Sequence, residues 1–169
     1  LAPEVTDLDW VDAARGREVP VRLYWPVLTD AEQPVPLVVF SHGIGGSRRG
    51  YSYLGRHFAS QGIASLHVQH VGSDRGLWAG NPLGLVGRLW DAASEQEALA
   101  RARDLRFALD ELLEHTPQGR QVDRDRVAAA GHSYGANTAM LVTGAQVLRR
   151  GEAVALRDTR FKAALLLSA

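Results

Sequence analysis

The chain has 169 residues, which is enough for one domain with its own hydrophobic core and too few for two comfortable ones. It is 46% hydrophobic and 22% charged, and 19 Lys and Arg residues balance 19 Asp and Glu residues. This composition is ordinary for a folded domain, without the basic excess that indicates nucleic-acid binding or the acidic excess of a solvating tail.

Cysteine is absent, which excludes disulfides, thiolate nucleophiles and cysteine-based zinc sites. No apolar run approaches the ~20 residues of a membrane span, and no signal peptide is visible. The sequence leaves the compartment, cytoplasmic or secreted, and the oligomeric state open. Because the chain starts at Leu1 without an initiator Met, we expect that residues precede it.

The first third of the chain predicts β structure. Segments around Val5–Val11 and Glu18–Trp25 flank a turn at DAARGRE, which indicates an antiparallel hairpin. The stretch VPLVVFSHG, which ends at Gly43, is a continuous apolar run closed by glycine. Such a run is typical of a strand buried on both faces in a parallel sheet.

The next stretch alternates helix and strand. YSYLGRHFASQG has helical spacing with a stop at Gly62, and IASLHVQH predicts a strand. From Gly72 to Trp90 the chain is rich in glycine and aromatic residues without clear periodicity, which indicates a long connection. Its tryptophans, Trp78 and Trp90, could form a wall of a substrate site or pack the connection itself.

A helix is expected after Ala93. Ser94 and Glu97 form the S-x-x-E pattern of a capping box, and Pro117 ends the helix. One apolar stripe follows steps of four and three, through Ala98, Ala102, Leu105, Leu109 and Leu112. Glu97 and Arg101 stand four apart, which predicts an ion pair on the other side of the helix.

The last third gives a strand at DRVAAAG, a helix at ANTAMLVTGAQVL and a final apolar strand at RFKAALLLSA. Strands that alternate with helices predict the α/β class, a mostly parallel sheet with helices on both faces. We expect residues 1–169 to form a single domain of this kind.

A serine stands between two glycines at the junction of the predicted strand and helix. Gly131, Ser133 and Gly135 match G-x-S-x-G, in which the chain turns sharply and exposes a nucleophilic serine at a helix N-terminus. The two glycines keep that turn free of steric clash, and the helix dipole favours developing negative charge. The alternative is a serine that caps an ordinary helix.

A second glycine-rich stretch, FSHGIGGSRRGY, follows the first buried strand. Acyl transfer needs two N–H donors aimed at the oxyanion of the tetrahedral intermediate. We expect one from Tyr134, which follows the nucleophile, and the other from Ile44 in this loop. The alternative is a glycine-rich turn without a ligand. The phosphate-loop pattern G-x-x-x-x-G-K-[ST] is absent.

These stretches, together with RDLRFALDELL, resemble the α/β-hydrolase superfamily over roughly residues 18–169. The most similar branch comprises serine esterases like platelet-activating-factor acetylhydrolase and dienelactone hydrolase. The resemblance implies an α/β-hydrolase fold with Ser133 as nucleophile and the backbones of Ile44 and Tyr134 as oxyanion hole. It implies cleavage of a small-molecule carboxylic ester through an acyl-enzyme, without a cofactor or a metal.

The general base is missing from its expected place. In this fold the chain order is Ser, then Asp or Glu, then His, and the residues after Ser133 contain no histidine. All six histidines precede it, at positions 42, 57, 67, 70, 115 and 132. We therefore expect the domain to be incomplete, without the C-terminal strands that carry the acid and the histidine, and this fragment to be inactive alone.

No upstream residue is a convincing substitute. His67 and His70 stand three apart on one predicted strand, on opposite faces, which also argues against a zinc site. His70 lies nearest the ligand-binding end of the sheet and is the least implausible stand-in. We assign no catalytic role to Asp104 or Asp158. The rival hypothesis is a non-catalytic α/β-hydrolase-like module that binds a ligand without a complete triad.

Overall fold

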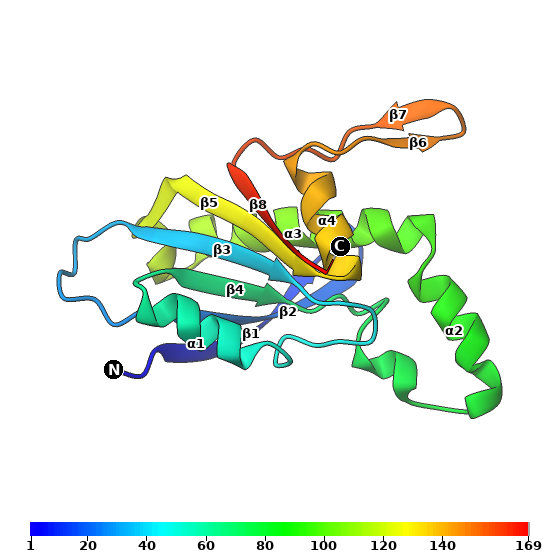
Figure 1. The fold of residues 1–169 in the computed structure, drawn as a ribbon, viewed down its shortest axis with the longest axis horizontal. Helices are drawn as coiled ribbons and strands as arrows, with labels where there is room; N and C mark the ends of the chain where they lie inside the picture. The colour runs from blue at the N-terminus through cyan, green and yellow to red at the C-terminus, as the bar shows by residue number, and fades with distance from the viewer. Residues whose placement is uncertain (169) are drawn as a thin grey trace.

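A computed structural model describes residues 1–168, and they form a six-stranded mixed sheet with helices on both faces (Figure 1). The strands of this sheet follow the order β1 (Glu4–Asp12), β2 (Arg17–Trp25), β4 (Ala64–Val68), β3 (Val35–Ser41), β5 (Val122–His132) and β8 (Ala163–Leu167). The pairings of β1 with β2 and of β2 with β4 are antiparallel. The three other pairings, which join β4, β3, β5 and β8 in that order, are parallel. The predicted hairpin and parallel sheet are both present.

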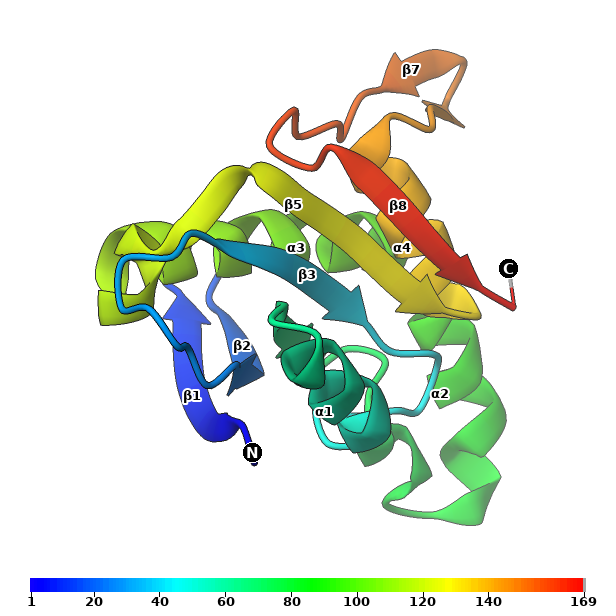
Figure 2. The same ribbon diagram turned by 60° about the vertical axis from the view of Figure 1, so that its left-hand side comes forward.

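Four α-helices and three short 3₁₀ turns connect the strands in the described part of the chain. They are α1 (Ser52–Ser60), α2 (Leu85–Ala92), α3 (Glu95–His115) and α4 (Tyr134–Thr143), with η1 (Arg75–Trp78), η2 (Pro82–Gly84) and η3 (Pro117–Arg120). Figure 2 shows α1 in front of the sheet and α3 and α4 behind it. In Figure 1, α2 lies beyond the carboxyl ends of β3 and β5.

The central strands are buried on both faces, as their continuous apolar sequence predicts. On the face covered by α3 and α4, side chains such as Leu37, Val39 and Ala129 join one hydrophobic cluster with the apolar stripe of α3. The alternate residues Val38 and Phe40 face the other way and pack with α1. Because successive side chains of a strand point to opposite faces, β3 contributes to a hydrophobic cluster on each side of the sheet.

Three features differ from the sequence prediction. The connection after Gly72, for which the sequence predicted no regular structure, contains the eight-residue helix α2, whose Val86 and Trp90 are exposed. The helix after Ser133 ends at Thr143, because Gly144 adopts φ 132°. A small hairpin of β6 (Val147–Arg149) and β7 (Glu152–Val154) follows where helix was expected.

Within residues 1–168, no helix combines the length and apolar character needed to cross a bilayer.

His67 is one of the buried histidines that make the stability of the fold depend on pH. His67 on β4 is buried between the rings of Tyr24 and Phe40, and burial lowers its pKa from 6.5 to about 3. The unfolded chain takes up a proton at this histidine below pH 6.5, whereas the folded chain does not. The stability that the neutral imidazole contributes is therefore present above pH 6.5 and lost as the pH falls toward 3.

We expect His67→Phe to weaken the loss of stability on acidification by up to about 1.4 kcal/mol per pH unit. Urea unfolding at pH 7, 6 and 5 would measure the free energy of unfolding of both proteins. Parallel pH profiles for the variant and the natural sequence would show that His67 titrates alike in both states.

Candidate active site

Ser133 occupies the sharp turn between β5 and α4. Its backbone has φ 55° and ψ −114°, a region that costs a residue with a side chain of order 1–3 kcal/mol. The Ser133 N–H donates to the carbonyl of Leu167 on β8 at 2.9 Å, which holds the turn in place. The side chain itself is exposed to solvent.

An ordinary helix cap has a different geometry. Ser94 at the start of α3 has extended backbone, and its hydroxyl accepts the N–H of Glu97 as predicted. Ser133 has left-handed backbone and its side chain makes no capping hydrogen bond. The comparison with Ser94 shows that Ser133 is not an ordinary helix cap, which was the alternative left open by the sequence.

The glycines on either side of Ser133 are required by close backbone contacts. A Cβ at Gly135 would lie 1.9 Å from the carbonyl oxygen of Ser41, at the end of β3. A Cβ at Gly131 would lie 2.0 Å from the carbonyl oxygen of Gly135. Backbone atoms cannot move aside as a flexible side chain can, so both positions accept only glycine without a shift of the turn.

The loop after β3 folds as a tight turn against Ser133. The Gly46 N–H donates to the Gly43 carbonyl at 3.2 Å, and Gly45 has φ 75°, the arrangement of a type II turn. A Cβ at Gly43 would lie 3.7 Å from the Cβ of Ser133, so the loop backbone passes directly beside the serine.

Two backbone N–H groups at this junction, those of Ile44 and Tyr134, donate no hydrogen bond to the residues that the structure describes. Ile44 is the second residue of the turn, and its N–H has no acceptor among residues 1–168. Tyr134 is the first residue of α4, where helix N–H groups have no partner within the helix. Both groups belong to segments that meet at Ser133.

Tyr51 joins the two segments. Its hydroxyl accepts the N–H of Gly43 at 3.3 Å and lies 2.8 Å from Nδ1 of His132. This contact engages Nδ1 of His132, the residue that precedes Ser133. Tyr51 stands 82 residues before Ser133, and nothing in the sequence indicates that the two lie close together.

His70 does not reach Ser133. It is fully buried, with Nδ1 2.8 Å from Oδ2 of Asp104 and Nε2 2.7 Å from Oγ of Ser41. Burial, and to a lesser extent nearby arginines, hold the pKa of His70 well below 6.5. The neutral ring therefore donates from Nδ1 to Asp104 and accepts the Ser41 hydroxyl at Nε2. Ser41 is itself 0% exposed, so this hydrogen-bonded series cannot meet a substrate.

The other histidines of the described residues are also engaged or remote. His42 is buried, and its Nε2 accepts the backbone N–H of His70 at 3.0 Å, so it shapes the loop as expected. His57 lies exposed on α1, and His115 ends α3. None of these imidazoles forms a hydrogen bond with the Ser133 hydroxyl.

The predicted ion pair of Glu97 with Arg101 is wrong. Both side chains are buried: Glu97 pairs with Arg17 at 3.0 Å, while Arg101 donates to the carbonyl of His42 at 2.7 Å. The i,i+4 spacing places two residues on one helix face without saying whether that face is covered.

The two tryptophans of the long connection differ. The indole N–H of Trp78 donates to the carbonyl of Gly45 at 3.0 Å, and a Cβ at Gly45 would meet the indole ring at 2.4 Å. Trp78 thus packs the connection against the loop beside Ser133, although it remains 58% exposed. Trp90 on α2 is 75% exposed and does not serve packing.

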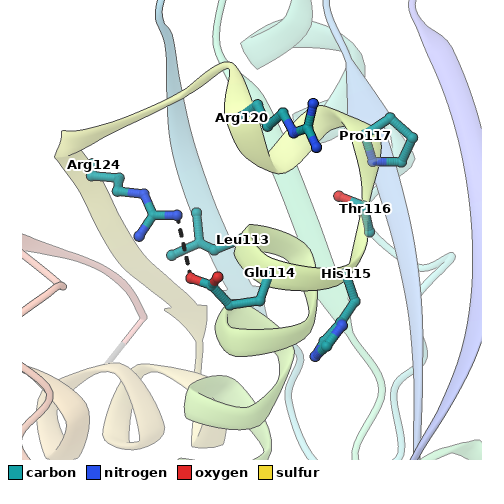
Figure 3. A pocket seen from close by; sticks show the side chains of 7 residues that line it. All are labelled: Leu113, Glu114, His115, Thr116, Pro117, Arg120 and Arg124. Carbon is teal, nitrogen blue, oxygen red and sulfur yellow. Dashed lines mark hydrogen bonds and ion pairs between the residues drawn. The ribbon is translucent and has the colours of Figure 1, made fainter.

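A cavity of about 710 Å³ lies elsewhere, around the end of α3 (Figure 3). Figure 3 shows Glu114 and Arg124 paired across it, at 3.3 Å. It adjoins the start of β5, whereas Ser133 follows the end of that 11-residue strand. At about 3.3 Å per residue the two places are roughly 30 Å apart, so this cavity is separate from the serine site.

No group of three or more potential metal ligands occurs within residues 1–168.

Comparison with known sequences gives one family match. The family model described as platelet-activating factor acetylhydrolase, isoform II, matches residues 12–76, which include the loop beside Ser133. A search of curated proteins finds no match.

Comparison with solved structures gives matches over most of the chain. A ferulic acid esterase from Streptomyces cinnamoneus matches with a TM-score of 0.65 and 27% identity, covering 82% of this chain and 54% of that one. An acetyl xylan esterase from Paenibacillus sp. R4 gives 0.63 and 26%, covering 96% and 48%. A dienelactone hydrolase from Anabaena variabilis gives 0.57 and 20%, covering 83% and 57%. The chain spans about half the length of these proteins.

The glycine contacts generate a prediction. We expect Gly135→Ala to destabilise the fold by about 3 kcal/mol or more, because the new methyl group meets the Ser41 carbonyl. Gly87→Ala in α2 is the matched control: nothing lies within 4 Å of its Cβ, so the fold should be stabilised by about 0.5–1 kcal/mol. Chemical denaturation measures both. Equal stabilities for the two variants would contradict the close contact at Gly135.

Proposed function

We propose that this chain, which has the α/β-hydrolase fold, belongs to a serine esterase that cleaves a small carboxylic ester through an acyl-enzyme at Ser133. The observation that carries the proposal is the exposed serine with φ 55° at the start of α4, beside a loop whose Ile44 N–H has no acceptor among the described residues. Strained backbone of this kind persists where the surrounding structure holds it and is concentrated at functional sites.

The chemistry follows from this arrangement. The Ser133 oxygen attacks the carbonyl carbon of the ester as a base removes its proton, and the carbonyl oxygen becomes an oxyanion between the N–H groups of Ile44 and Tyr134. The intermediate then collapses: the C–O bond to the alkoxide breaks, the alkoxide takes up that proton and leaves as the alcohol, and the acyl group stays on Ser133. Water then attacks the acyl-enzyme and releases the acid, through a second oxyanion at the same donors. No cofactor takes part in these steps.

The substrate class comes from the solved structures of similar fold. Two of them are described as a ferulic acid esterase and an acetyl xylan esterase. We infer a short or accessible acyl group for this chain as well. The exposed position of Ser133 agrees with an ester that reaches the site from solvent.

Replacement of the nucleophile is the first test. We expect Ser133→Ala, made in the natural protein that contains this chain, to lower kcat/KM for p-nitrophenyl acetate by at least about 10³-fold. Ser60→Ala at the exposed end of α1 is the control and should keep full activity. Thermal melts would show that both variants are folded. Unchanged hydrolysis by Ser133→Ala would refute the proposed nucleophile, whereas absence of hydrolysis by the folded natural protein would favour a non-catalytic binding module.

The histidine geometry gives a second test. Because none of the histidines described lies in position to serve Ser133, we expect residues 1–169 alone to hydrolyse p-nitrophenyl acetate only slowly, as a serine without its base is a weak nucleophile. His70→Ala should leave that slow rate unchanged in folded material. Rapid turnover by residues 1–169 that His70→Ala abolishes would mean that His70 is the base after all.

A further inference from the structure

One buried guanidinium contacts both segments that would stabilise the oxyanion. Arg101, on α3, is 0% exposed. Its Nη1 donates to the carbonyl of His42 at 2.7 Å, and its Nη2 donates to the carbonyl of Gly43 at 3.2 Å. Its guanidinium carbon also lies 4.4 Å from the ring centre of Tyr134. The Arg101 guanidinium thus contacts both the loop after β3 and the first residue of α4.

The contact with Gly43 determines where the Ile44 N–H points. The Gly43 carbonyl and the Ile44 N–H belong to one planar trans peptide unit, in which C=O and N–H point in opposite directions. Arg101 and the Gly46 N–H both bind the Gly43 oxygen and fix that plane from one side. The Ile44 N–H is therefore directed away from Arg101, toward the side where it meets no internal acceptor.

The charge also strengthens the donor. A cation bonded to an amide oxygen draws electron density from the peptide group and makes its N–H more positive, as in other hydrogen-bond chains of low dielectric. Burial lowers the pKa of Arg101 to about 10, which leaves the guanidinium charged at neutral pH. The effect therefore operates under ordinary conditions.

The position of Arg101 is itself fixed from behind. Its Nε donates to Oγ of Ser73 at 2.7 Å, and the Ser73 hydroxyl donates to Oε1 of Glu97 at 3.0 Å. Glu97 has no room to move, because a Cβ at Gly72 would lie 2.1 Å from its Oε2. A guanidinium bound on three sides is a rigid support.

We propose that Arg101 is the positioning residue of the oxyanion hole, which orients and polarises the Ile44 N–H through the Gly43 carbonyl and holds the ring of Tyr134. This role rests on the proposed esterase function, since the oxyanion hole has a purpose only if Ser133 attacks a carbonyl. Arg101 does not touch substrate and acts through the backbone of the loop.

The kinetic test uses Arg101→Met and Arg101→Lys in the natural protein that contains this chain. We expect Arg101→Met to lower kcat for p-nitrophenyl acetate by about 10- to 100-fold with KM within about threefold, because the oxyanion donor acts in the transition state. Arg101→Lys keeps the charge but not the planar fork, so a partial recovery of kcat is expected. A change confined to KM would contradict the role.

Arg15→Met is the matched control. Arg15 belongs to the same network of polar contacts, which links Asp104 through Arg17, Glu97 and Ser73 to Arg101, but it does not touch the loop. We expect it to lower stability while leaving kcat unchanged. If Arg15→Met lowers kcat as much as Arg101→Met does, the effect is general loss of structure and the positioning role is wrong.

A spectroscopic readout separates this proposal from the esterase proposal. The backbone order parameter of the Ile44 N–H, from ¹⁵N relaxation, should fall from about 0.85 in the natural sequence to below about 0.6 in folded Arg101→Met, and stay high in Arg15→Met. This measurement needs no substrate. An unchanged order parameter and amide shift at Ile44 in Arg101→Met overturn the positioning role, whereas activity that survives Ser133→Ala overturns the proposed mechanism at Ser133 and leaves the support of the loop intact.

Discussion

The tightest steric constraint in this fold is the contact between the backbone at the end of β3 and the backbone at the start of α4. Gly135 leaves no room for a methyl group against the carbonyl of Ser41, and Gly131 leaves none against Gly135 itself. This contact places the backbones of two segments, which are more than 90 residues apart in the chain, directly against each other. The strained turn at Ser133 and the loop that begins at His42 both follow from it.

Charge is buried around this junction, and its cost must be offset. Arg101 and Asp104 are both 0% exposed, and isolated charges in such places are strongly unfavourable. Asp104 is bound by Arg15, Arg17 and His70, while Arg101 is bound by backbone carbonyls and Ser73. Burial raises the pKa of Asp104, and the hydrogen bonds from Arg17 and Arg15 oppose that shift.

Such an assembly is a poor way to gain stability, because well-packed apolar residues would often do as well. The hydrogen bonds among these side chains fix their orientation instead, because each N–H must point toward its acceptor. The neutral His70, placed between Ser41 and Asp104, has the hydrogen-bond order of a catalytic triad while being closed to solvent. Exposure, rather than the order of the hydrogen bonds, distinguishes Ser133 from Ser41.

Sequence reasoning predicted the parts of the fold whose signal is local. The continuous apolar run of β3, the stripe of α3 and the cap at Ser94 depend on neighbours within a few residues, and the structure shows each of them. The fold class followed from their order, because alternating strands and helices pack as a parallel sheet. Similarity to solved esterases confirms that class.

What the sequence did not predict depends on contacts between distant segments. Glu97, Arg101, Asp104 and Ala108 follow steps of four, three and four, the same spacing as the apolar stripe beside them. That spacing is a signal of a second covered face, but polar side chains normally mark a solvated one. The partners that reverse this expectation, at Arg17 and in the loop after β3, lie more than 50 residues away.

The most direct measurement for the central claim is the mass of the protein after reaction with a fluorophosphonate, which attaches covalently to an activated serine. With the folded natural protein that contains this chain, the account predicts one adduct, located by peptide mass analysis on Ser133 and absent from Ser133→Ala. An adduct on a different serine, or no adduct on Ser133 under conditions in which the fold is intact, would contradict the assignment of Ser133 as the nucleophile.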